Sequence, residues 1–260
     1  MISVQEVPGL EDELLQVNRH MERLCMSNSP SMQKMVDWVL NARGKQIRPI
    51  LTLLCSRLKG KKVDATEVAA IIEICHTASL IHDDIIDDAD TRRGQLSVQK
   101  KFGREMAVYC GDFMIFAAMG RTDLRIKPWY RAMFSRLEMM CDGEISQYDN
   151  QYNTDIKEEK YMENIVGKTS AMFSIACEAG AYEGKCDPGE IEAIDEFAKN
   201  LGLLFQIRAA GGYGYTLKKM EHFKNLAKES LEIFGDSVAR RKLTELVDYL
   251  WESTNALRME

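Results

Sequence analysis

The stretch VAAIIEICHTASLIHDDIIDDADTRRG, from Val68 to Gly94, begins as an apolar helical pattern and ends in acids and arginines. Five aspartates fall within the eight residues 83–90, and two arginines follow directly. A solvated acidic helix end is the simplest interpretation of such a run. However, apolar residues interleave with the acids, which indicates a core helix with a charged end. Aspartates at the C-terminal end of a helix oppose its macrodipole, so a site that bears this cost favours a bound cation.

The spacing of the aspartates suits a divalent metal ion. Asp83 and Asp87 stand at positions i and i+4, so on a helix their carboxylates project from one face, and Asp84 lies beside that face. Mg²⁺ takes oxygen ligands and is commonly held by one or two carboxylates together with substrate phosphate oxygens. Arg92 and Arg93 follow closely, and the planar guanidinium group binds phosphate through two parallel hydrogen bonds. The stretch therefore predicts a site for a magnesium-bound diphosphate.

The rest of the chain also shows helical spacing of apolar residues, and strict strand alternation is hard to find. No repeat, linker or shift in composition marks a domain boundary. We therefore expect one all-α domain over residues 1–260. The spacing predicts helices at roughly 9–27, 31–42, 46–59, 64–89, 104–119, 129–152, 158–180, 188–208, 215–234 and 236–256.

The composition excludes several classes of protein. The formal net charge of −6 argues against a general nucleic-acid binder, which would carry a basic surface. The seven cysteines form no C-x-x-C pair, so neither a zinc site nor a disulfide framework is indicated. No signal-peptide pattern and no long apolar run is visible, so we expect a cytoplasmic chain without a transmembrane segment.

Two further basic elements could contact phosphate. In ARGKQIRPIL, Arg43, Lys45 and Arg48 stand around Gly44 just before an apolar helix, although a basic loop at a helix start is the alternative. GKTSAMF lacks the preceding strand and the upstream glycine of a nucleotide P-loop, so a P-loop is not indicated. Lys168 and Thr169 could still reach a phosphate from within a helix. His76 lies two turns before Asp83 and is by itself either a core residue or a ligand.

These pieces together resemble the trans-polyprenyl diphosphate synthases, the family that makes linear isoprenoid chains. GKQIRP is similar to the family's G-K-x-x-R-P element, and LIHDDIIDDADTRRG is similar to its first aspartate-rich motif, D-D-x-x-D followed by R-R-G. CGDFM, CDGEISQ, GKTSAMF and GLLFQIR stand in the family's order. The resemblance covers nearly the whole chain up to Arg208 and again from about Gly211 to Leu250.

The resemblance implies a helical bundle with a central apolar cavity and a head-to-tail condensation of two diphosphates. An allylic diphosphate would bind through Mg²⁺ to Asp83 and Asp87, supported by Asp84. Further contacts to the allylic diphosphate would come from Arg92, Lys168, Thr169 and Gln206. Isopentenyl diphosphate would be held by Lys45, Arg48, His76 and Arg93. The catalytic set implied is Asp83, Asp84, Asp87, Arg92 and Lys168.

The resemblance also bears on product length and assembly. In this family the growing chain extends along the helix of Asp83, so Ser79 and Ala78, one turn before it, would form the floor of the tunnel. Both are small, and we expect a medium-to-long product. Family members usually form homodimers, and the helix from Met106 to Met119 is apolar on more than one face. We expect it to lie near a homodimer interface.

One departure from the family is the sequence FQIRAAGGYGYT, where a second aspartate-rich motif is expected. Either a segment carrying that motif after Arg208 is missing from this sequence, or the protein lacks the motif. The abrupt return of similarity beyond the break favours the first explanation. Under the second, the chain would serve as a non-catalytic or regulatory subunit.

Two other classes of metal protein share single features with this sequence. His82-Asp83 is a literal H-D pair, which would suit an HD-type metal phosphohydrolase, but such a site needs further histidines and the chain has only four. A ferritin-like di-iron bundle could use Glu73-x-x-His76, but it needs that motif twice.

Overall fold

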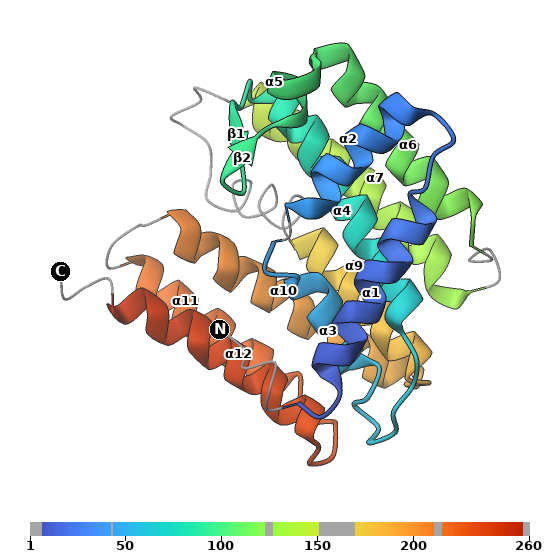
Figure 1. Cartoon of the computed structure of the whole chain (residues 1–260). Coiled ribbons are helices and arrows are strands. Elements are labelled where there is room, and N and C mark those ends of the chain that lie inside the picture. Colours follow the sequence, from blue (N-terminus) through green and yellow to red (C-terminus); the bar gives the residue numbers. More distant parts are fainter. Residues whose placement is uncertain (1–6, 43, 123–126, 151–169, 211–214, 257–260) are drawn as a thin grey trace. The chain divides into compact units, whose positions relative to one another are not determined.

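The computed structural model describes residues 7–42, 44–122, 127–150, 170–210 and 215–256 (Figure 1). Within these ranges the chain is helical apart from one short hairpin, so the all-α prediction is confirmed. No helix in these ranges is long and apolar enough to cross a membrane. In chain order the elements are α1 (Leu10–Leu24), α2 (Pro30–Asn41), α3 (Ile47–Cys55), α4 (Thr66–Ile86), β1 (Thr91–Arg92), β2 (Gln95–Leu96), α5 (Val98–Phe102), α6 (Arg104–Gly120), α7 (Pro128–Asp149), α9 (Ala171–Glu183), α10 (Pro188–Ala210), α11 (Tyr215–Glu229) and α12 (Val238–Ala256).

The chain divides into two compact units. The N-terminal unit contains Gly9–Ile50 and Thr66–Ile126, and the C-terminal unit contains Met1–Pro8, Leu51–Ala65 and Lys127–Glu260. The prediction of one domain over 1–260 concerns the whole chain and stays a prediction.

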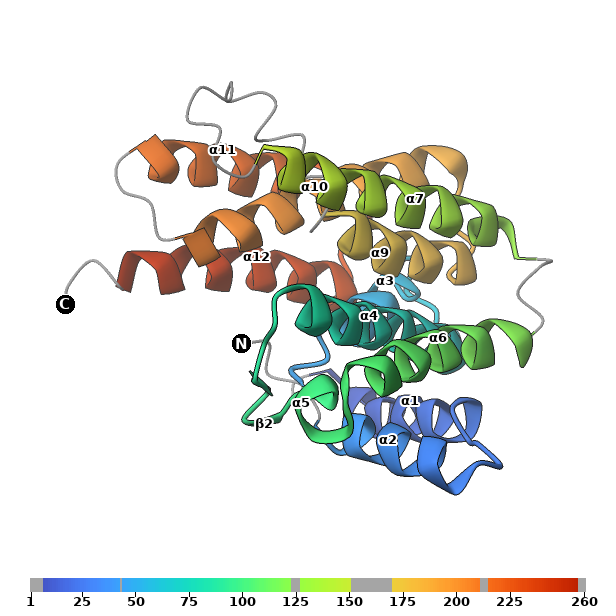
Figure 2. The same cartoon turned by 90° about the horizontal axis from the view of Figure 1, so that it is seen from above.

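Helix α4 is the core of the N-terminal unit. It packs against α1, α5 and α6, and α2 packs against α5 and α6 (Figures 1 and 2). Three of its isoleucines, Ile71, Ile72 and Ile74, are fully buried. At its N-terminal end, Arg23 of α1 donates a hydrogen bond to Glu67 Oε1 at 2.5 Å. A buried, multiply packed helix fixes the direction of whatever side chains its C-terminal end carries.

The C-terminal end of α4 is closed by a left-handed residue. Asp88 has φ +49°, and the Ala89 N–H donates to the Asp84 carbonyl at 2.9 Å. This is the bond pattern of a Schellman motif, in which the left-handed residue follows the helix. Helix α4 therefore ends at Ile86, three residues before the predicted end, although the Asp87 N–H still donates to the Asp83 carbonyl at 2.8 Å.

A two-stranded hairpin follows, which the periodicity did not predict. Thr91 pairs with Leu96 and Arg92 with Gln95, so Arg93 and Gly94 form the loop. Both loop residues have positive φ, +52° and +79°, as a type I′ turn requires. This geometry explains the glycine of R-R-G.

Side chains tie the hairpin to α2 and α4. Trp38 Nε1 donates to the Leu96 carbonyl at 3.0 Å, and Gln95 Nε2 donates to the Trp38 carbonyl at 3.0 Å. Gln99 Nε2 donates to the carbonyls of Asp84, at 2.6 Å, and Ala89, at 3.1 Å. The loop carrying the arginines is thus fixed to the end of the helix carrying the aspartates.

In the C-terminal unit, α10 packs against α9, α11 and α12, and α7 packs against α9. The predicted start of the helix 188–208 is confirmed by a reciprocal capping box at Asp187. The Glu190 N–H donates to Asp187 Oδ1 at 3.0 Å, and the Asp187 N–H donates to Glu190 Oε2 at 2.8 Å.

Several predicted helices are too long at their C-terminal ends. Helix α3 stops at Cys55 and α11 at Glu229, instead of about 59 and 234. In both places the backbone continues in i→i−3 bonds, such as Leu58 N–H to the Cys55 carbonyl and Phe234 N–H to the Leu231 carbonyl. Such tight turns keep apolar side chains at near-helical spacing, so the pattern alone does not reveal the helix end. Of the predicted helix 158–180, residues 158–169 lie outside the described part.

Candidate functional site

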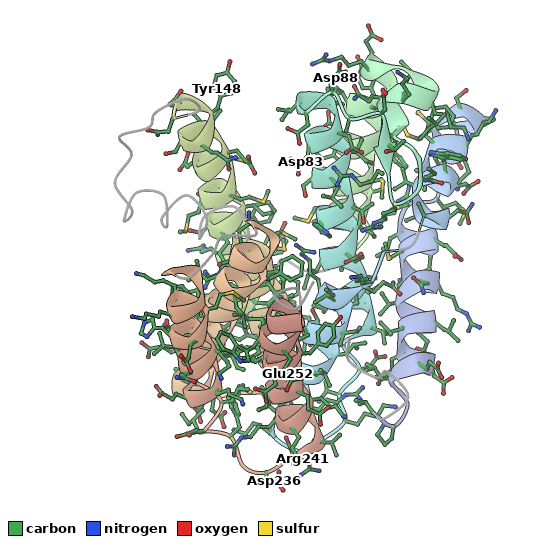
Figure 3. The ribbon with its side chains drawn as sticks, turned by 90° about the vertical axis from the view of Figure 1, so that its left-hand side faces the viewer. Asp83, Asp88, Tyr148, Asp236, Arg241 and Glu252 are labelled. Carbon is green, nitrogen blue, oxygen red and sulfur yellow. The ribbon has the colours of Figure 1, made fainter. Side chains whose placement is uncertain are left out.

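The acidic part of the candidate site stands at the C-terminal end of α4 (Figure 3). Asp83 is half-buried, whereas Asp87 and Asp88 are exposed. The hydrogen bond from the Asp87 N–H to the Asp83 carbonyl preserves helical spacing between the two predicted metal-binding residues. Within the described ranges, no group of three acidic, histidine or cysteine side chains could hold a metal ion alone.

Asp84 differs from the neighbouring aspartates because it is buried. Its side chain is 5% exposed and accepts hydrogen bonds from Arg92 Nε, at 2.8 Å, and from the terminal NH2 group of Arg92. These bonds raise the pKa of Arg92, against the opposing effect of burial. Asp84 therefore fixes the guanidinium plane of Arg92 beside the aspartates, and both predicted residues are brought together with Asp83.

His82 packs on a glycine of α6. A Cβ at Gly111 would lie 2.9 Å from His82 Cδ2, so only glycine leaves room for this ring. His82 Nε2 lies 3.4 Å from Asp112 Oδ1. This contact joins the CGDFM segment to the residue that precedes Asp83.

The cationic part of the site centres on Arg48 and His76. Arg48 NH1 lies 2.8 Å from His76 Nε2, which must be the acceptor because a guanidinium group only donates. Burial, followed by the charges of Arg48, Arg93 and Arg92, lowers the pKa of His76 to about 2. Burial also lowers the pKa of Arg48 to about 10, still well above neutrality. The pair is therefore a charged arginine on a neutral histidine.

Arg93 is held by three neighbours from two segments of the chain. Its NH1 donates to the Ala42 carbonyl at 2.9 Å, and its NH2 lies 3.9 Å from Glu73 Oε1. The guanidinium group lies flat on Gly44, where a Cβ would come within 2.7 Å of Arg93 Cζ. The glycine of G-K-x-x-R-P thus leaves room for the guanidinium group of the second arginine of R-R-G. This contact joins the two motifs.

The segment that leads from Gly44 to Arg48 is also fixed. Gln46 has φ +49°, and its Nε2 donates to Asn18 Oδ1 of α1 at 2.8 Å. Lys45 beside it is exposed. The structure brings Lys45 into the same segment as Arg48, with its side chain in solvent.

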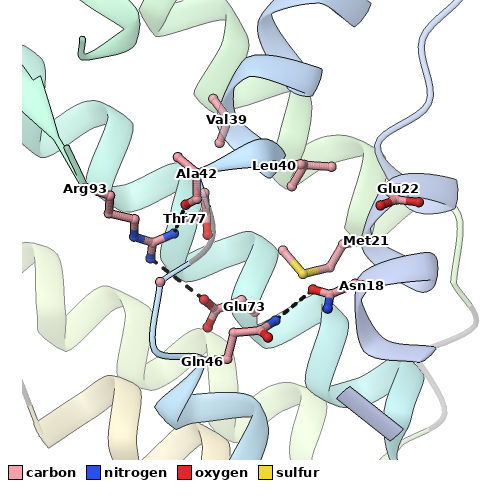
Figure 4. A pocket seen from close by; sticks show the side chains of 11 residues that line it. Asn18, Met21, Glu22, Val39, Leu40, Ala42, Gln46, Glu73, Thr77 and Arg93 are labelled. Atoms are coloured by element: carbon pink, nitrogen blue, oxygen red, sulfur yellow. Dashed lines mark hydrogen bonds and ion pairs between the residues drawn. The ribbon is translucent and has the colours of Figure 1, made fainter. Parts of the chain in front are cut away.

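Arg93 lines two pockets, one of which is drawn in Figure 4. The one drawn in Figure 4 is also lined by Asn18, Gln46 and Glu73. The second is lined by Asp84, Arg92 and the hairpin. Both share Val39, Ala42, Thr77 and Arg93. Arg93 thus lines one hollow together with Glu73 and another together with Asp84 and Arg92.

The remaining predicted residues divide by location. Ala78 is fully buried in the core of the N-terminal unit, whereas Ser79 is half-buried and its Oγ donates to the His76 carbonyl at 2.8 Å. Gln206 lies half-buried on α10 of the C-terminal unit. Lys168 and Thr169 lie outside the described residues.

Sequence reasoning missed three features of this site. It did not predict the hairpin, the seat that Gly44 provides for Arg93, or the buried Glu73 between the arginines. The turn had a local signal, because a glycine after a polar residue between short extended segments is a hairpin cue. The seat and the buried acid depend on tertiary contacts and had none.

The fold is that of the all-α isoprenoid synthases. A decaprenyl diphosphate synthase from Rhodobacter capsulatus superposes with a TM-score of 0.88 at 22% identity, covering 95% of this chain and 97% of that one. At this identity the likeness shows the fold alone.

The family follows from sequence. The family model described as "Polyprenyl synthetase" matches residues 29–209. The chain is 38% identical over 176 residues to a short chain isoprenyl diphosphate synthase from Methanothermobacter thermautotrophicus, covering 65% of this chain and 54% of that protein. It is 33% identical over 172 residues to the octaprenyl diphosphate synthase of Escherichia coli, covering 65% and 53%. The chain therefore belongs to the polyprenyl synthetase family.

This membership overturns the phosphohydrolase and di-iron alternatives. The chain spans between about half and two thirds of the length of the curated relatives it matches.

Proposed function

We propose that the protein is a prenyltransferase that condenses isopentenyl diphosphate with an allylic diphosphate and releases diphosphate. One observation carries the proposal. In a single unit of a polyprenyl synthetase family chain, two aspartates at an exposed helix end stand beside a separate, partly buried cluster of arginines. That arrangement suits two diphosphates, one bound with metal and one without.

The reaction breaks the allylic C–O bond, and the electron pair leaves with the diphosphate. The double bond of isopentenyl diphosphate attacks the allylic carbon, and the product loses a proton as its new double bond forms. Cationic groups near the leaving diphosphate stabilise its developing charge. Arg92, oriented by Asp84, would serve this role, with Lys168, Thr169 and Gln206 as further proposed contacts.

Isopentenyl diphosphate would bind the cationic part. Arg48 and Arg93 are held by protein partners before any ligand arrives, so little ordering is needed on binding. Lys45, being exposed, can close on the ligand from solvent. His76 stays neutral and accepts from Arg48, so it would position that arginine and face the same ligand.

The donor set fits Mg²⁺. Asp83 and Asp87 offer hard carboxylate oxygens one turn apart in a solvent-accessible position, and Mg²⁺ is typically held by such carboxylates plus phosphate oxygens. The metal would supply charge stabilisation on the allylic diphosphate. The absence of a complete three-residue cluster in the described ranges agrees with sharing the ion with substrate.

We further propose a medium-to-long product. Ser79, half-buried on the face of Asp83, is the better floor residue, because Ala78 is fully buried in the unit's core. A ring at Ala78 would overpack that core at a cost of about 1–3 kcal/mol. Ser79→Phe should therefore shorten the products seen by chromatography without loss of stability. A wild type that stops at farnesyl length, or a variant with unchanged products, contradicts this part.

Quaternary structure and location are also proposals. Helix α6 exposes apolar side chains, among them Tyr109 at 61% and Phe116 at 70%, which supports a homodimer through this helix. Sedimentation at micromolar concentration should give the mass of two chains, and a monomer would exclude the interface. We propose a cytoplasmic location.

The absence of the second aspartate-rich motif after Arg208 bears on whether the chain catalyses the condensation. We propose that FQIRAAGGYGYT marks a segment missing from this sequence, so the one-domain synthase is longer than this chain. The names of the relatives favour a synthase over a non-catalytic subunit.

The deciding experiment is a condensation assay with isopentenyl diphosphate, an allylic primer and Mg²⁺, on protein that includes the segment proposed to be missing after Arg208, with a chelator as control. Product formation that the chelator abolishes supports the proposal. Binding of both diphosphates without product would favour the non-catalytic subunit. Failure to bind either diphosphate would refute the proposal.

A further inference from the structure

Glu73 is a buried acid in the middle of the cationic cluster. It lies on α4 one turn before His76 and is only 3% exposed. Its Oε1 lies 3.9 Å from Arg93 NH2 (Figure 4). Its charge also acts on Arg48, whose pKa it raises against the effect of burial. One carboxylate thus serves two guanidinium groups from separate segments.

Without this acid the cluster would be self-repelling. The like charge of Arg93 lowers the pKa of Arg48, whose side chain is partly buried. A buried charge left without compensation is strongly unfavourable, so its side chain would move toward solvent. The distance of 3.9 Å between Glu73 Oε1 and Arg93 NH2 is long for an ion pair. Glu73 therefore attracts the guanidinium group of Arg93 without a close contact.

We propose that Glu73 is a positioning residue for isopentenyl diphosphate, a role that rests on the function proposed above. It holds Arg48 and Arg93 at fixed separation, so that a diphosphate meets both arginines already in place. A purely electrostatic role would act in the opposite direction, because an acid near a phosphate site repels the ligand. The two roles therefore predict opposite effects when the charge is removed.

The test is the affinity of isopentenyl diphosphate for this chain, measured by titration calorimetry, which requires no turnover. Glu73→Gln should weaken binding about 10-fold, the lower end of what losing an outer-shell partner costs at a metal site. Glu73→Asp, which keeps a carboxylate, should lose less. The matched control is Glu22→Gln, an exposed acid lining the same pocket, which should bind like wild type.

The outcomes separate the two proposals. If wild type fails to bind isopentenyl diphosphate, the proposed function fails. If wild type binds and Glu73→Gln binds equally or more tightly, only the positioning role is overturned. If Glu73→Gln does not fold, Glu73→Asp decides: affinity equal to wild type shows that any carboxylate suffices, and overturns fixed positioning. An unchanged affinity for the allylic diphosphate in both variants is also required.

Discussion

The two parts of the candidate site meet at neighbouring arginines but are built in opposite ways. In the cationic part, Arg48 and Arg93 are fixed by His76, the Ala42 carbonyl and a glycine seat. In the acidic part, Asp87 stands exposed just beyond a helix end. The first is arranged in advance for an anion, whereas the second needs a metal ion and a diphosphate to complete it. Substitutions should therefore act through geometry in the cationic part and through charge in the acidic part.

The largest expected effect is the loss of a metal-binding carboxylate. Asp87→Asn should lower magnesium-dependent condensation by about 100-fold or more, comparable to losing one group that stabilises transition-state charge. Stability without metal should hold or rise slightly, because an acid at a helix C-terminus opposes the macrodipole by about 0.3–1 kcal/mol. Steady-state kinetics and thermal unfolding check the two parts.

The control for this substitution is Asp90→Asn. Asp90 lies three residues further along, and its Oδ1 pairs with Lys100 Nζ at 2.7 Å on the surface. Exposed pairs of this kind contribute little, so activity should stay near wild type. Equal losses at Asp87 and Asp90 would mean that net charge, and not metal binding, explains the effect.

The cationic part can be disturbed without touching a charge. Gly44→Ala places a Cβ within 2.8 Å of Arg93 Nε and must displace that guanidinium group. Losing a charge-assisted contact costs about 1.5–3 kcal/mol, so the KM for isopentenyl diphosphate should rise roughly 10- to 100-fold. The KM for the allylic substrate should change much less.

Gly120→Ala provides the matched control for this glycine substitution. A Cβ at Gly120 meets nothing within 4 Å, and Gly120 ends α6 away from the cluster. The variant should match wild type in both KM values. If Gly44→Ala also matched wild type, the flat seat for Arg93 would be irrelevant to binding.

The two parts also differ in how far sequence could predict them. Asp83 and Asp87 depend only on helical spacing, so their shared face followed from the pattern. The meeting of Gly44 with Arg93 joins residues far apart in the chain, so no local rule could supply it. The end of α4 was only partly predictable from the sequence. An aspartate tolerates a left-handed conformation, but Asp88 has no feature that marks it as the helix-ending residue among its acidic neighbours.

His76 in the cationic part should make stability depend on pH. The folded state holds the pKa of His76 at about 2, against 6.5 in the unfolded chain. Below pH 6.5 the unfolded chain therefore binds a proton that the folded chain does not, so stability falls as pH falls. Well above this pH His76 is neutral in both states, so the stability lost on acidification is fully regained. Between pH 6.5 and 5.5 the loss should be about 1 kcal/mol.

His76→Gln tests this dependence, because glutamine can accept from Arg48 but does not titrate. Denaturant unfolding at several pH values should give a curve for the variant that is flatter than wild type above pH 5, where most carboxylates remain ionised. Parallel curves would mean that His76 already titrates normally in the folded protein.

The smallest expected effect separates Asp88 from its neighbours in the acidic part. Asp88 is exposed and occupies the left-handed position after α4, where glycine is the preferred residue. Asp88→Gly should therefore keep condensation activity and change stability by no more than about 1 kcal/mol, in the stabilising direction. Asp88→Ala should be about 1–2 kcal/mol less stable than Asp88→Gly, because a Cβ disfavours this conformation and alanine has no side-chain hydrogen bond to offset it. Thermal unfolding in the absence of metal measures both changes. A loss of activity in Asp88→Gly as large as in Asp87→Asn would make Asp88 a metal ligand, and would show that this end of the helix is rearranged when substrate binds.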